Sequence, residues 1–234
     1  MIPNWIIFYT SPTRGLMQKV AHNQSAGARA AGMRESCETR NAPVQYLETK
    51  VDGAIGTITL DHPEKRNALS KQLVDAIVDT LTSFSRERTR VVVLRAQSGA
   101  KVWSSGHDVA ELPEGRRDPL GWDDPLRYLV RAIEELPAPV IAMIEGGVWG
   151  GACEVVFACD LIIAAPSATF AVTPARLGVP YNVSGMLTFL NACSLRIVKE
   201  MAFTAKPVSA ERAERLAIIN HLVPAGQLEA FTYR

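Results

Sequence analysis

The sequence has little of what marks several specialised protein classes. Its 25 lysines and arginines almost balance its 24 aspartates and glutamates, which gives a formal net charge of +1. A charge balance this close to neutral provides no electrostatic basis for binding nucleic acid or an anionic membrane surface. No apolar run reaches the roughly 18 residues that a membrane-spanning helix requires. We therefore expect neither nucleic acid nor a membrane as a partner.

Cysteine and histidine are also scarce. The four cysteines are Cys37, Cys153, Cys159 and Cys193. They form no C-x-x-C pair, and their spacing fits neither a zinc site nor a disulfide framework. The four histidines are isolated or followed by Asp, and none belongs to an H-E-x-x-H motif. We predict buried free thiols, no metal site and a reducing compartment, the cytoplasm.

The first 44 residues differ from the rest of the chain. No aspartate or glutamate precedes Glu35, and neither a helical nor a strand period persists. Three explanations remain open: a mitochondrial transit peptide, an upstream extension from a misassigned start codon, and a disordered tail. We expect residues 1–44 to lie outside the folded core, which covers residues 45–234. A transit peptide would place the protein in the mitochondrial matrix instead of the cytoplasm.

Hydrophobic periodicity in the remaining sequence predicts an alternation of strands and helices. The expected strands are Tyr46–Val51, Ala54–Leu60, Val91–Arg95, Val140–Ile144, Leu161–Ala165 and Thr169–Val172. The expected helices are one capped by Ser70 that runs through Phe84, and Pro125–Leu136, Gly151–Ala158, Ser184–Cys193, Ser194–Phe203 and Ser209–Ile219. Apolar runs such as VVVLR and VIAMI are typical of strands buried on both faces. The repeated order strand, strand, helix predicts an α/β fold of stacked ββα units.

Two short glycine-containing segments carry most of the chemical signal. They are Val102–Asp108 (VWSSGHD) and Glu145–Glu154 (EGGVWGGACE), of which the second reads as a strand, a glycine turn and a helix start. Each segment places glycine beside a residue whose backbone N–H can point into a pocket. Two converging N–H groups, one of them at a helix N-terminus, form an oxyanion hole that stabilises negative charge on a carbonyl oxygen.

Other interpretations of these segments are weaker. The glycine spacing after residue 145 is not G-x-G-x-x-G, which argues against a dinucleotide site. Ser104, Ser105, His107 and Asp108 are too close in sequence to face one another as a catalytic triad, and there is no G-x-S-x-G motif. Whether His107 is a turn residue or a backbone donor remains open from the residues alone.

Three polar residues further along the chain also have two interpretations each. Glu154 is either a helix-start acid favoured by the helix dipole or a pocket carboxylate whose pKa is raised by burial. Thr173 and Tyr181 fall in a segment rich in proline and glycine, Thr173–Gly185, which we expect to be a loop. They are either ordinary loop residues or residues that shape a pocket.

At this point the chain resembles the crotonase (enoyl-CoA hydratase/isomerase) superfamily, from about Gln45 to Tyr233. The segments that carry the resemblance are Lys65–Ser70 (KRNALS), Lys101–Leu112 (KVWSSGHDVAEL), Val148–Asp160 (VWGGACEVVFACD) and Phe170–Pro180 (FAVTPARLGVP). The resemblance implies a spiral of stacked ββα units, a coenzyme A thioester as substrate, no additional cofactor, and a homotrimer or dimer of trimers.

The same resemblance implies roles for individual residues. The thioester oxygen would lie between the backbone N–H groups of His107 and Gly151. The residues that would line the thioester and pantetheine end are Gly106, His107, Asp108, Val109, Ala110 and Glu111. Thr173 and Tyr181 match positions that, in decarboxylases of this superfamily, lie near the carboxylate that leaves. Glu154 matches a glutamate of the hydratases and is a possible acid.

One departure from the hydratase pattern decides the expected reaction. Hydratases of the superfamily use two glutamates, and the second falls here on Pro174, which can act neither as an acid nor as a base. Water addition needs one group to activate water and another to protonate carbon. The resemblance therefore implies a carbon–carbon lyase that decarboxylates a 2-alkylmalonyl-CoA, converting methylmalonyl-CoA to propionyl-CoA.

A second departure lies at the C-terminal end. The family continues beyond the region of Leu228–Arg234 with helices that close the pocket and meet neighbouring subunits, and we expect these helices to be missing here. Trimer contacts and part of the nucleotide site would then be lost as well. An enoyl-CoA hydratase or isomerase, and a non-catalytic remnant of the family, remain the alternatives.

Overall fold

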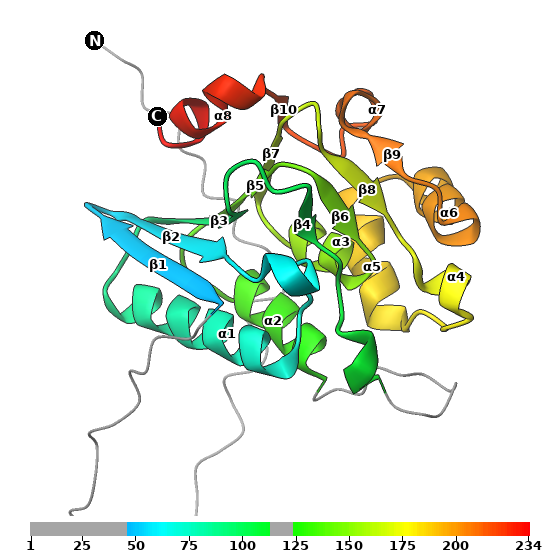
Figure 1. Ribbon diagram of the computed structural model, residues 1–234, viewed down its shortest axis with the longest axis horizontal. Coiled ribbons are helices and arrows are strands. Elements are labelled where there is room, and N and C mark those ends of the chain that lie inside the picture. Colours follow the sequence, from blue (N-terminus) through cyan, green and yellow to red (C-terminus); the bar gives the residue numbers. More distant parts are fainter. Residues whose placement is uncertain (1–45, 113–123) are drawn as a thin grey trace, which may run out of the picture. The chain divides into compact units, whose positions relative to one another are not determined.

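The computed structural model describes residues 46–112 and 124–234 (Figure 1). The predictions for residues 1–44 fall outside these ranges. The described part begins with an antiparallel hairpin of β1 (Leu47–Asp52) and β2 (Ile55–Leu60). Gly53 at its turn has φ +59°, a conformation that glycine adopts without steric cost. The predicted hairpin is confirmed, with bounds that differ by one residue.

The larger sheet has six strands in the order β1-β2-β3-β5-β7-β10. Beyond the hairpin, β3 (Val91–Ala96), β5 (Val140–Ile144), β7 (Leu161–Ala164) and β10 (His221–Leu222) are added in parallel. Alternate residues of β3 and β5 face opposite sides, and both sides are buried: Val92 and Ala142 belong to the main core, whereas Val93 and Met143 belong to a smaller cluster. The continuous apolar runs therefore belong to strands buried on both faces, as the sequence predicts.

The smaller sheet has four strands in the order β4-β6-β8-β9. Its strands are β4 (Val102–Ser104), β6 (Gly147–Trp149), β8 (Thr169–Ala171) and β9 (Val208–Ser209), and the first three are parallel. The chain passes from β3 to β4, from β5 to β6 and from β7 to β8, so each pair places one strand in each sheet before the next helix. This alternation is the predicted stack of ββα units. Trp103 of β4 joins the two sheets by donating from Nε1 to the carbonyl of Met143 at 3.0 Å.

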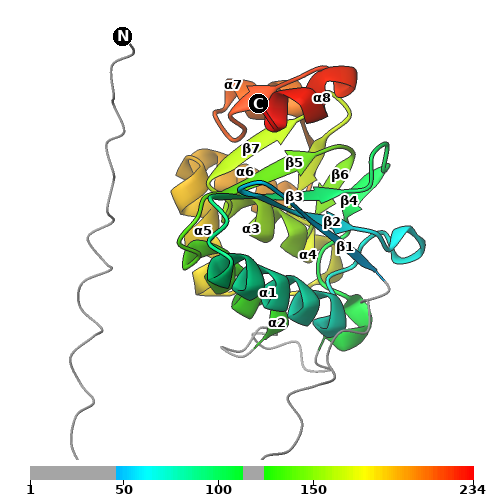
Figure 2. The same ribbon diagram turned by 90° about the vertical axis from the view of Figure 1, so that its left-hand side faces the viewer.

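Helices cover both faces of the larger sheet. On one side, α1 (Lys71–Arg86), α2 (Pro125–Glu134) and α3 (Gly151–Phe157) pack side by side, and Ser70 caps α1 by accepting from the N–H of Leu73 at 3.4 Å. On the other side, α8 (Ala225–Thr232) packs against β5 and β7 (Figures 1 and 2). The described residues contain no helix with both the length and the apolar composition needed to cross a bilayer.

The remaining elements follow β8 or lie in loops. They are α4 (Pro174–Leu177), α5 (Val183–Ala192), α6 (Leu195–Thr204), α7 (Ala210–Arg215), and the short 3-10 turns η2 (Pro63–Lys65) and η3 (Val109–Glu111). The helix predicted over Ser209–Ile219 ends earlier, at Arg215, because Ala217 has φ +55°. The expected loop Thr173–Gly185 contains α4, which Pro174 begins and Gly178 ends in a left-handed conformation.

Two of the three described cysteines agree with the prediction of buried free thiols. Cys153 and Cys159 are buried free thiols, Cys193 is free and partly exposed, and Cys37 lies outside the described residues. Burial raises the pKa of Cys153 to about 12, so this thiol is not a nucleophile at neutral pH. Within residues 46–112 and 124–234 there is no cluster of three or more His, Cys, Asp or Glu side chains that could hold a metal ion.

Candidate active site

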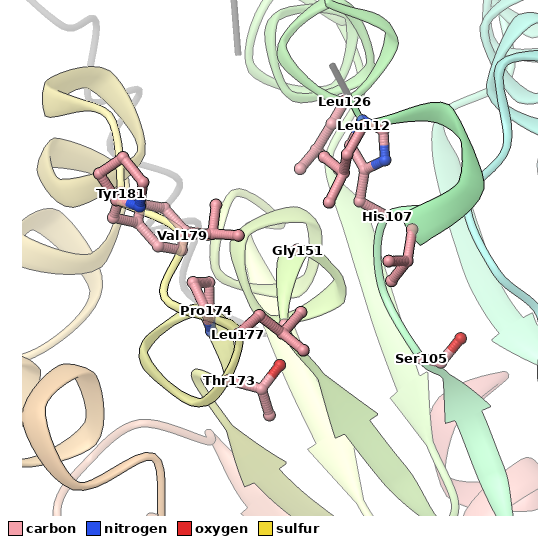
Figure 3. A pocket seen from close by; sticks show the side chains of 13 residues that line it. Ser105, His107, Leu112, Leu126, Gly151, Thr173, Pro174, Leu177, Val179 and Tyr181 are labelled. Carbon is pink, nitrogen blue, oxygen red and sulfur yellow. The ribbon is translucent and has the colours of Figure 1, made fainter. Parts of the chain in front are cut away.

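A pocket lies where three parallel strands end. Ser105 directly follows β4, Gly150 directly follows β6, and Thr173 is the second residue after β8. Because these strands are parallel, their carboxyl ends meet at one edge of the smaller sheet, with β6 between the other two. About 660 Å³ of empty space, including the open mouth, adjoins this edge. Figure 3 shows Ser105 and Thr173 at the base of this pocket, on either side of Gly151.

The wall of the pocket is mainly apolar. The apolar lining residues include Leu112, Leu126, Pro174, Leu177, Val179 and Pro180. The polar side chains that line the pocket are those of Ser105, His107, Thr173 and Tyr181. Within the part of the chain that the structure describes, no Asp, Glu, Lys or Arg lines this pocket. Among the described residues, the polar groups that a charged ligand would meet in this pocket are hydroxyls, the His107 imidazole and backbone groups.

Backbone N–H groups from two loops come together in the pocket. Gly151 is the first residue of α3, so its N–H has no partner within the helix. A Cβ on Gly106, which has φ +86°, would lie 2.6 Å from the nitrogen of Gly151 and 2.5 Å from the carbonyl oxygen of Trp149. A Cβ on Gly151 would lie 3.4 Å from the nitrogen of His107. Only glycine at position 106 allows the two loops to approach this closely.

The hydrogen bonds beside His107 leave its own N–H on the side of the strand that faces away from Leu69. Gly106 accepts from the N–H of Leu69 at 2.8 Å, and Asp108 donates to the carbonyl of Leu69 at 3.5 Å. Leu69 and His107 are thus paired in a parallel bridge. In such a bridge the N–H of the residue between these two bonds points to the opposite side of the strand. The structure therefore brings together the two backbone donors that the sequence analysis singles out.

A polar network that the sequence analysis did not single out fixes this loop. Ser104 donates from Oγ to the carbonyl of Asn67 at 2.7 Å and accepts from the N–H of Gly106 at 3.1 Å. Asn67 in turn donates from Nδ2 to the carbonyl of Trp103 at 2.9 Å. Asn67 is buried and has φ +50°, a conformation that asparagine tolerates better than most residues. The only sequence signal for it is its place in the segment KRNALS.

The imidazole of His107 bridges two separate elements. Its Nδ1 lies 3.0 Å from the carbonyl oxygen of Asp108, and its Nε2 lies 3.2 Å from Oδ2 of Asp124. The other oxygen of Asp124 caps α2 by accepting from the N–H of Leu126 at 2.9 Å. Burial lowers the pKa of His107, but the hydrogen bonds to Asp124 and to the Asp108 carbonyl raise it by more, so the net shift is upward. Figure 3 shows the ring beside Leu112 and Leu126.

Glu154 is fully buried on α3 and does not line the pocket. Its Oε1 forms an ion pair with Nη1 of Arg127, and its Oε2 accepts from the hydroxyl of Tyr181 at 2.9 Å. Burial raises the pKa of Glu154, whereas the charge of Arg127 and the bond from Tyr181 lower it. Both carboxylate oxygens therefore have protein partners. The sequence analysis did not identify Arg127. Its position three residues before Val130 places it on the buried face of α2, where a charged residue indicates a buried partner.

Thr173 and Pro174 both face the pocket, as Figure 3 shows. A Cβ on Gly150 would lie 3.0 Å from Oγ1 of Thr173, so this hydroxyl sits beside the glycine turn. Among the described residues, the Thr173 hydroxyl has no hydrogen-bond partner. Pro174 is the first residue of α4 and supplies only apolar surface.

The segment after His107 is only partly in the pocket. Val109 lines it and is exposed, whereas Asp108, Ala110 and Glu111 do not line it. Asp108 caps η3 by accepting from the N–H of Ala110 at 3.0 Å, and Glu111 accepts from the N–H of Lys71 at 2.7 Å. These polar groups stabilise the local turn and its attachment to α1. Their expected contact with a pantetheine arm stays a prediction.

Comparison with known proteins gives a consistent set of relatives. Residues 50–233 match the protein family described as enoyl-CoA hydratase/isomerase. Methylmalonyl-CoA decarboxylase of Escherichia coli (strain K12) is 46% identical over 188 residues, which cover 80% of this chain and 72% of the relative. Mitochondrial enoyl-CoA hydratase domain-containing protein 3 of Mus musculus is 30% identical over 213 residues, covering 90% of this chain and 70% of the relative.

Solved structures agree with the sequence matches. A structure of methylmalonyl-CoA decarboxylase in complex with 2-nitronate-propionyl-CoA superimposes with a TM-score of 0.79 and 46% identity, covering 81% of this chain and 73% of the other. A Geobacillus kaustophilus structure described as an enoyl-CoA hydratase subunit I superimposes with a TM-score of 0.72 and 31% identity, covering 81% of this chain and 73% of the other.

Proposed function

Because the chain belongs to the enoyl-CoA hydratase/isomerase family, we propose that it is a cofactor-independent carboxy-lyase acting on a 2-alkylmalonyl-CoA thioester. The specific reaction is the conversion of methylmalonyl-CoA to propionyl-CoA and CO2. The relative that shares 46% of its residues bears the name of this reaction. A solved relative of equal identity binds a nitronate analogue of propionyl-CoA.

The observation that carries this proposal is the burial of the Glu154 side chain and the bonding of both its carboxylate oxygens. Its two oxygens are occupied by Arg127 and Tyr181, and its side chain is fully buried behind the pocket. The position where a second glutamate would serve a hydratase holds Pro174. Water addition needs a base for water and an acid for carbon, and among the described residues the lining of the pocket offers no carboxylate for either task.

Decarboxylation has different requirements. The bond between C2 and the carboxylate carbon breaks, CO2 leaves, and the electron pair passes through C2 onto the thioester oxygen. The N–H groups of His107 and Gly151 would hold that oxygen, and one such donor is worth about 3 kcal/mol to the transition state. The resulting enolate then takes a proton at C2 from solvent water. No base is needed, and the thioester itself accepts the electrons.

The leaving carboxylate requires a contact that does not stabilise it too strongly. A cation paired with the carboxylate would lower the energy of the reactant more than that of the transition state, in which this charge is lost. The free hydroxyl of Thr173 is a neutral donor beside the glycine turn. Tyr181 lines the same pocket, although its hydroxyl proton is directed to Glu154. We therefore assign Thr173 to donating a hydrogen bond to the carboxylate, Tyr181 to orienting it through the ring that lines the pocket, and Glu154 to holding Tyr181.

Assembly and location complete the proposal. The family resemblance favours a homotrimer or a dimer of trimers. The reaction as written needs no metal and no cofactor beyond the coenzyme A of the substrate. We propose the cytoplasm as the compartment, with the mitochondrial matrix as the alternative if residues 1–44 are a transit peptide.

The test compares two substrates with the purified chain and no added cofactor. With methylmalonyl-CoA, we expect CO2 release and propionyl-CoA, identified by mass spectrometry. With crotonyl-CoA, we expect no hydration. The matched control is Gly151→Pro, which removes one donor N–H and should abolish turnover. Hydration of crotonyl-CoA without CO2 release would establish a hydratase instead. A folded protein that binds acyl-CoA and turns over neither substrate would be a non-catalytic family member.

A further inference from the structure

Both ring nitrogens of His107 face atoms that can only accept a hydrogen bond. Nδ1 lies 3.0 Å from the backbone carbonyl oxygen of Asp108, and Nε2 lies 3.2 Å from Oδ2 of Asp124. A neutral imidazole carries one N–H, so it can satisfy only one of these acceptors. The doubly protonated imidazolium satisfies both. The ring and the carboxylate are each only about one tenth exposed, at 11% and 10%, so water does not easily replace either partner.

We propose that His107 carries both ring protons in the folded protein, and that this imidazolium positions the adjacent backbone N–H by clamping the loop of Gly106–Asp108 to the first turn of α2. The side chain of His107 is thus a positioning group, distinct from the backbone N–H of the same residue. The clamp is geometric because its two ends belong to separate elements. One end is the loop after β4, and the other is the cap of α2.

The surrounding charges favour a cation at this position. Among the described residues, the charged groups that act on the ring are the carboxylates of Asp124, at the start of α2, and of Glu111 in η3. Arg127 is paired with Glu154, and Lys65 lies 3.7 Å from Asp108. In the part of the chain that the structure describes, both of these cations thus already face a carboxylate, and Asp124 and Glu111 leave an excess of negative charge beside the ring. An imidazolium would compensate this local excess of negative charge.

The position of α2 matters because it forms one wall of the pocket. Asp124 caps the helix, and the next two residues are Pro125 and Leu126. Leu126 packs directly against the second donor loop: a Cβ on Gly151 would lie 2.6 Å from its Cδ2. The clamp through His107 thus joins the two sides of the donor pair, one through the His107 loop and one through Leu126. Loosening it would change the separation of the two N–H groups.

A fixed separation affects the transition state more than the bound substrate. The oxygen of an enolate carries more negative charge than that of a thioester, so it depends more on two well-placed donors. The imidazolium also adds a positive charge near the same oxygen. This effect on turnover rests on the proposed decarboxylation, whereas the protonation of the ring does not.

The first experiment measures the ring alone. The ligand-free, full-length chain is labelled with 15N-histidine, and the ring signals of His107 are assigned by their loss in His107→Gln. At about pH 7, where an ordinary histidine is mostly neutral, we expect both nitrogens of His107 to be protonated. A ring with one protonated and one unprotonated nitrogen at this pH would overturn the proposal. This result does not depend on any substrate or variant being active.

The second experiment tests the clamp with Asp124→Asn. Asparagine is as good a helix cap as aspartate, so α2 should be retained, while the negative charge that faces the ring is removed. We expect the ring to lose its second proton at lower pH than in the wild type. We also expect kcat to fall about tenfold at neutral pH, with little change in KM, because the N–H acts mainly in the transition state. Asp75→Asn on α1 is the control, since Asp75 pairs with Lys71 on the surface.

The outcomes separate the two proposals. If the wild type shows the doubly protonated ring but no decarboxylation, the proposed function fails and the assignment of the ring stands. If Asp124→Asn shifts the titration of the ring while kcat and its pH profile stay as in Asp75→Asn, the positioning role is overturned. If the rate loss in Asp124→Asn is recovered at lower pH, where the ring is protonated again, the clamp is supported.

Discussion

The hydroxyl of Tyr181 donates a hydrogen bond to Oε2 of Glu154 at 2.9 Å. The sequence offers these two residues for separate tasks, Tyr181 to orient a carboxylate and Glu154 as a possible acid. The structure pairs them with each other, and Arg127 completes the group through Oε1 of Glu154. Burial raises the pKa of Tyr181 well above its ordinary value, so the phenol keeps its proton. The carboxylate of Glu154 thus fixes the orientation of the Tyr181 hydroxyl group.

The ion pair of Arg127 and Glu154 predicts a large stability effect. Glu154→Gln leaves the guanidinium of Arg127 buried without a counter-charge, which should lower the free energy of unfolding by about 3–5 kcal/mol. Urea denaturation at neutral pH measures this change. Arg127→Met combined with Glu154→Gln removes the unpaired charge and keeps an acceptor for Tyr181, so it should recover most of the loss. A single variant as stable as the wild type would contradict the prediction.

Replacing Gly106 by alanine should reduce activity, whereas the same replacement at Gly99 should not. Gly106 and Gly99 have similar left-handed conformations, φ +86° and +75°, but a Cβ on Gly99 meets nothing within 4 Å. Both replacements by alanine incur about 1 kcal/mol of backbone strain. Only Gly106→Ala places a methyl against the nitrogen of Gly151, and it should reduce kcat/KM on the order of a hundredfold. Equal activity in the two variants would show that the donor loops tolerate separation.

Gly185 of α5 allows Tyr181 and Glu154 to meet. A Cβ there would lie 2.4 Å from the ring of Tyr181 and 2.8 Å from Oε2 of Glu154. Gly185→Ala should therefore destabilise the fold by about 1–3 kcal/mol and slow decarboxylation. In Gly226→Ala, a helical site with open space, the same change should stabilise the fold by about 0.5–1 kcal/mol. Thermal unfolding of both variants checks this, and a stabilised Gly185→Ala would refute the tight contact.

Thr173 and Tyr181 should separate rate from stability. Thr173→Val removes a hydroxyl without a partner among the described residues, so it should slow decarboxylation about tenfold and leave stability nearly unchanged. Tyr181→Phe should slow the reaction by about ten- to a hundredfold and also cost about 1–3 kcal/mol, because Glu154 loses a buried partner. Propionyl-CoA binding should change little in either. Unchanged rates in both variants would place these hydroxyls outside the site.

The raised pKa of His107 predicts how stability depends on pH. The folded pKa lies above the ordinary value of 6.5, because the bonds to Asp124 and to the Asp108 carbonyl outweigh the effect of burial. The stabilisation by the proton is therefore complete below pH 6.5 and is lost as the pH rises through the folded value. The stability difference between the wild type and His107→Gln should thus shrink with rising pH. Urea denaturation from about pH 5.5 to about pH 9 measures it; a difference that grows would contradict this sign.

The sequence predicts the repeated elements well because their signal is local. A long apolar run such as Val140–Ile144 indicates a strand buried on both faces. The helical spacing of apolar residues after Ser70 indicates a helix with one buried face. The strands β4, β9 and β10 were not predicted, because two or three residues are too few to show an alternation. The helix α8 was missed for a similar reason, since its eight residues have a weak apolar pattern.

The sequence by itself determined the glycine positions at which two loops can approach, the absence of a carboxylate at Pro174, and the α/β class. These depend on what one residue type can or cannot do. Only the tertiary structure decided the partners of Glu154 and His107. Arg127 precedes Glu154 by 27 residues, and Tyr181 follows it by 27 residues. Asp124 lies 17 residues after His107. Which charges meet across such separations depends on how the helices pack, and no local pattern records it.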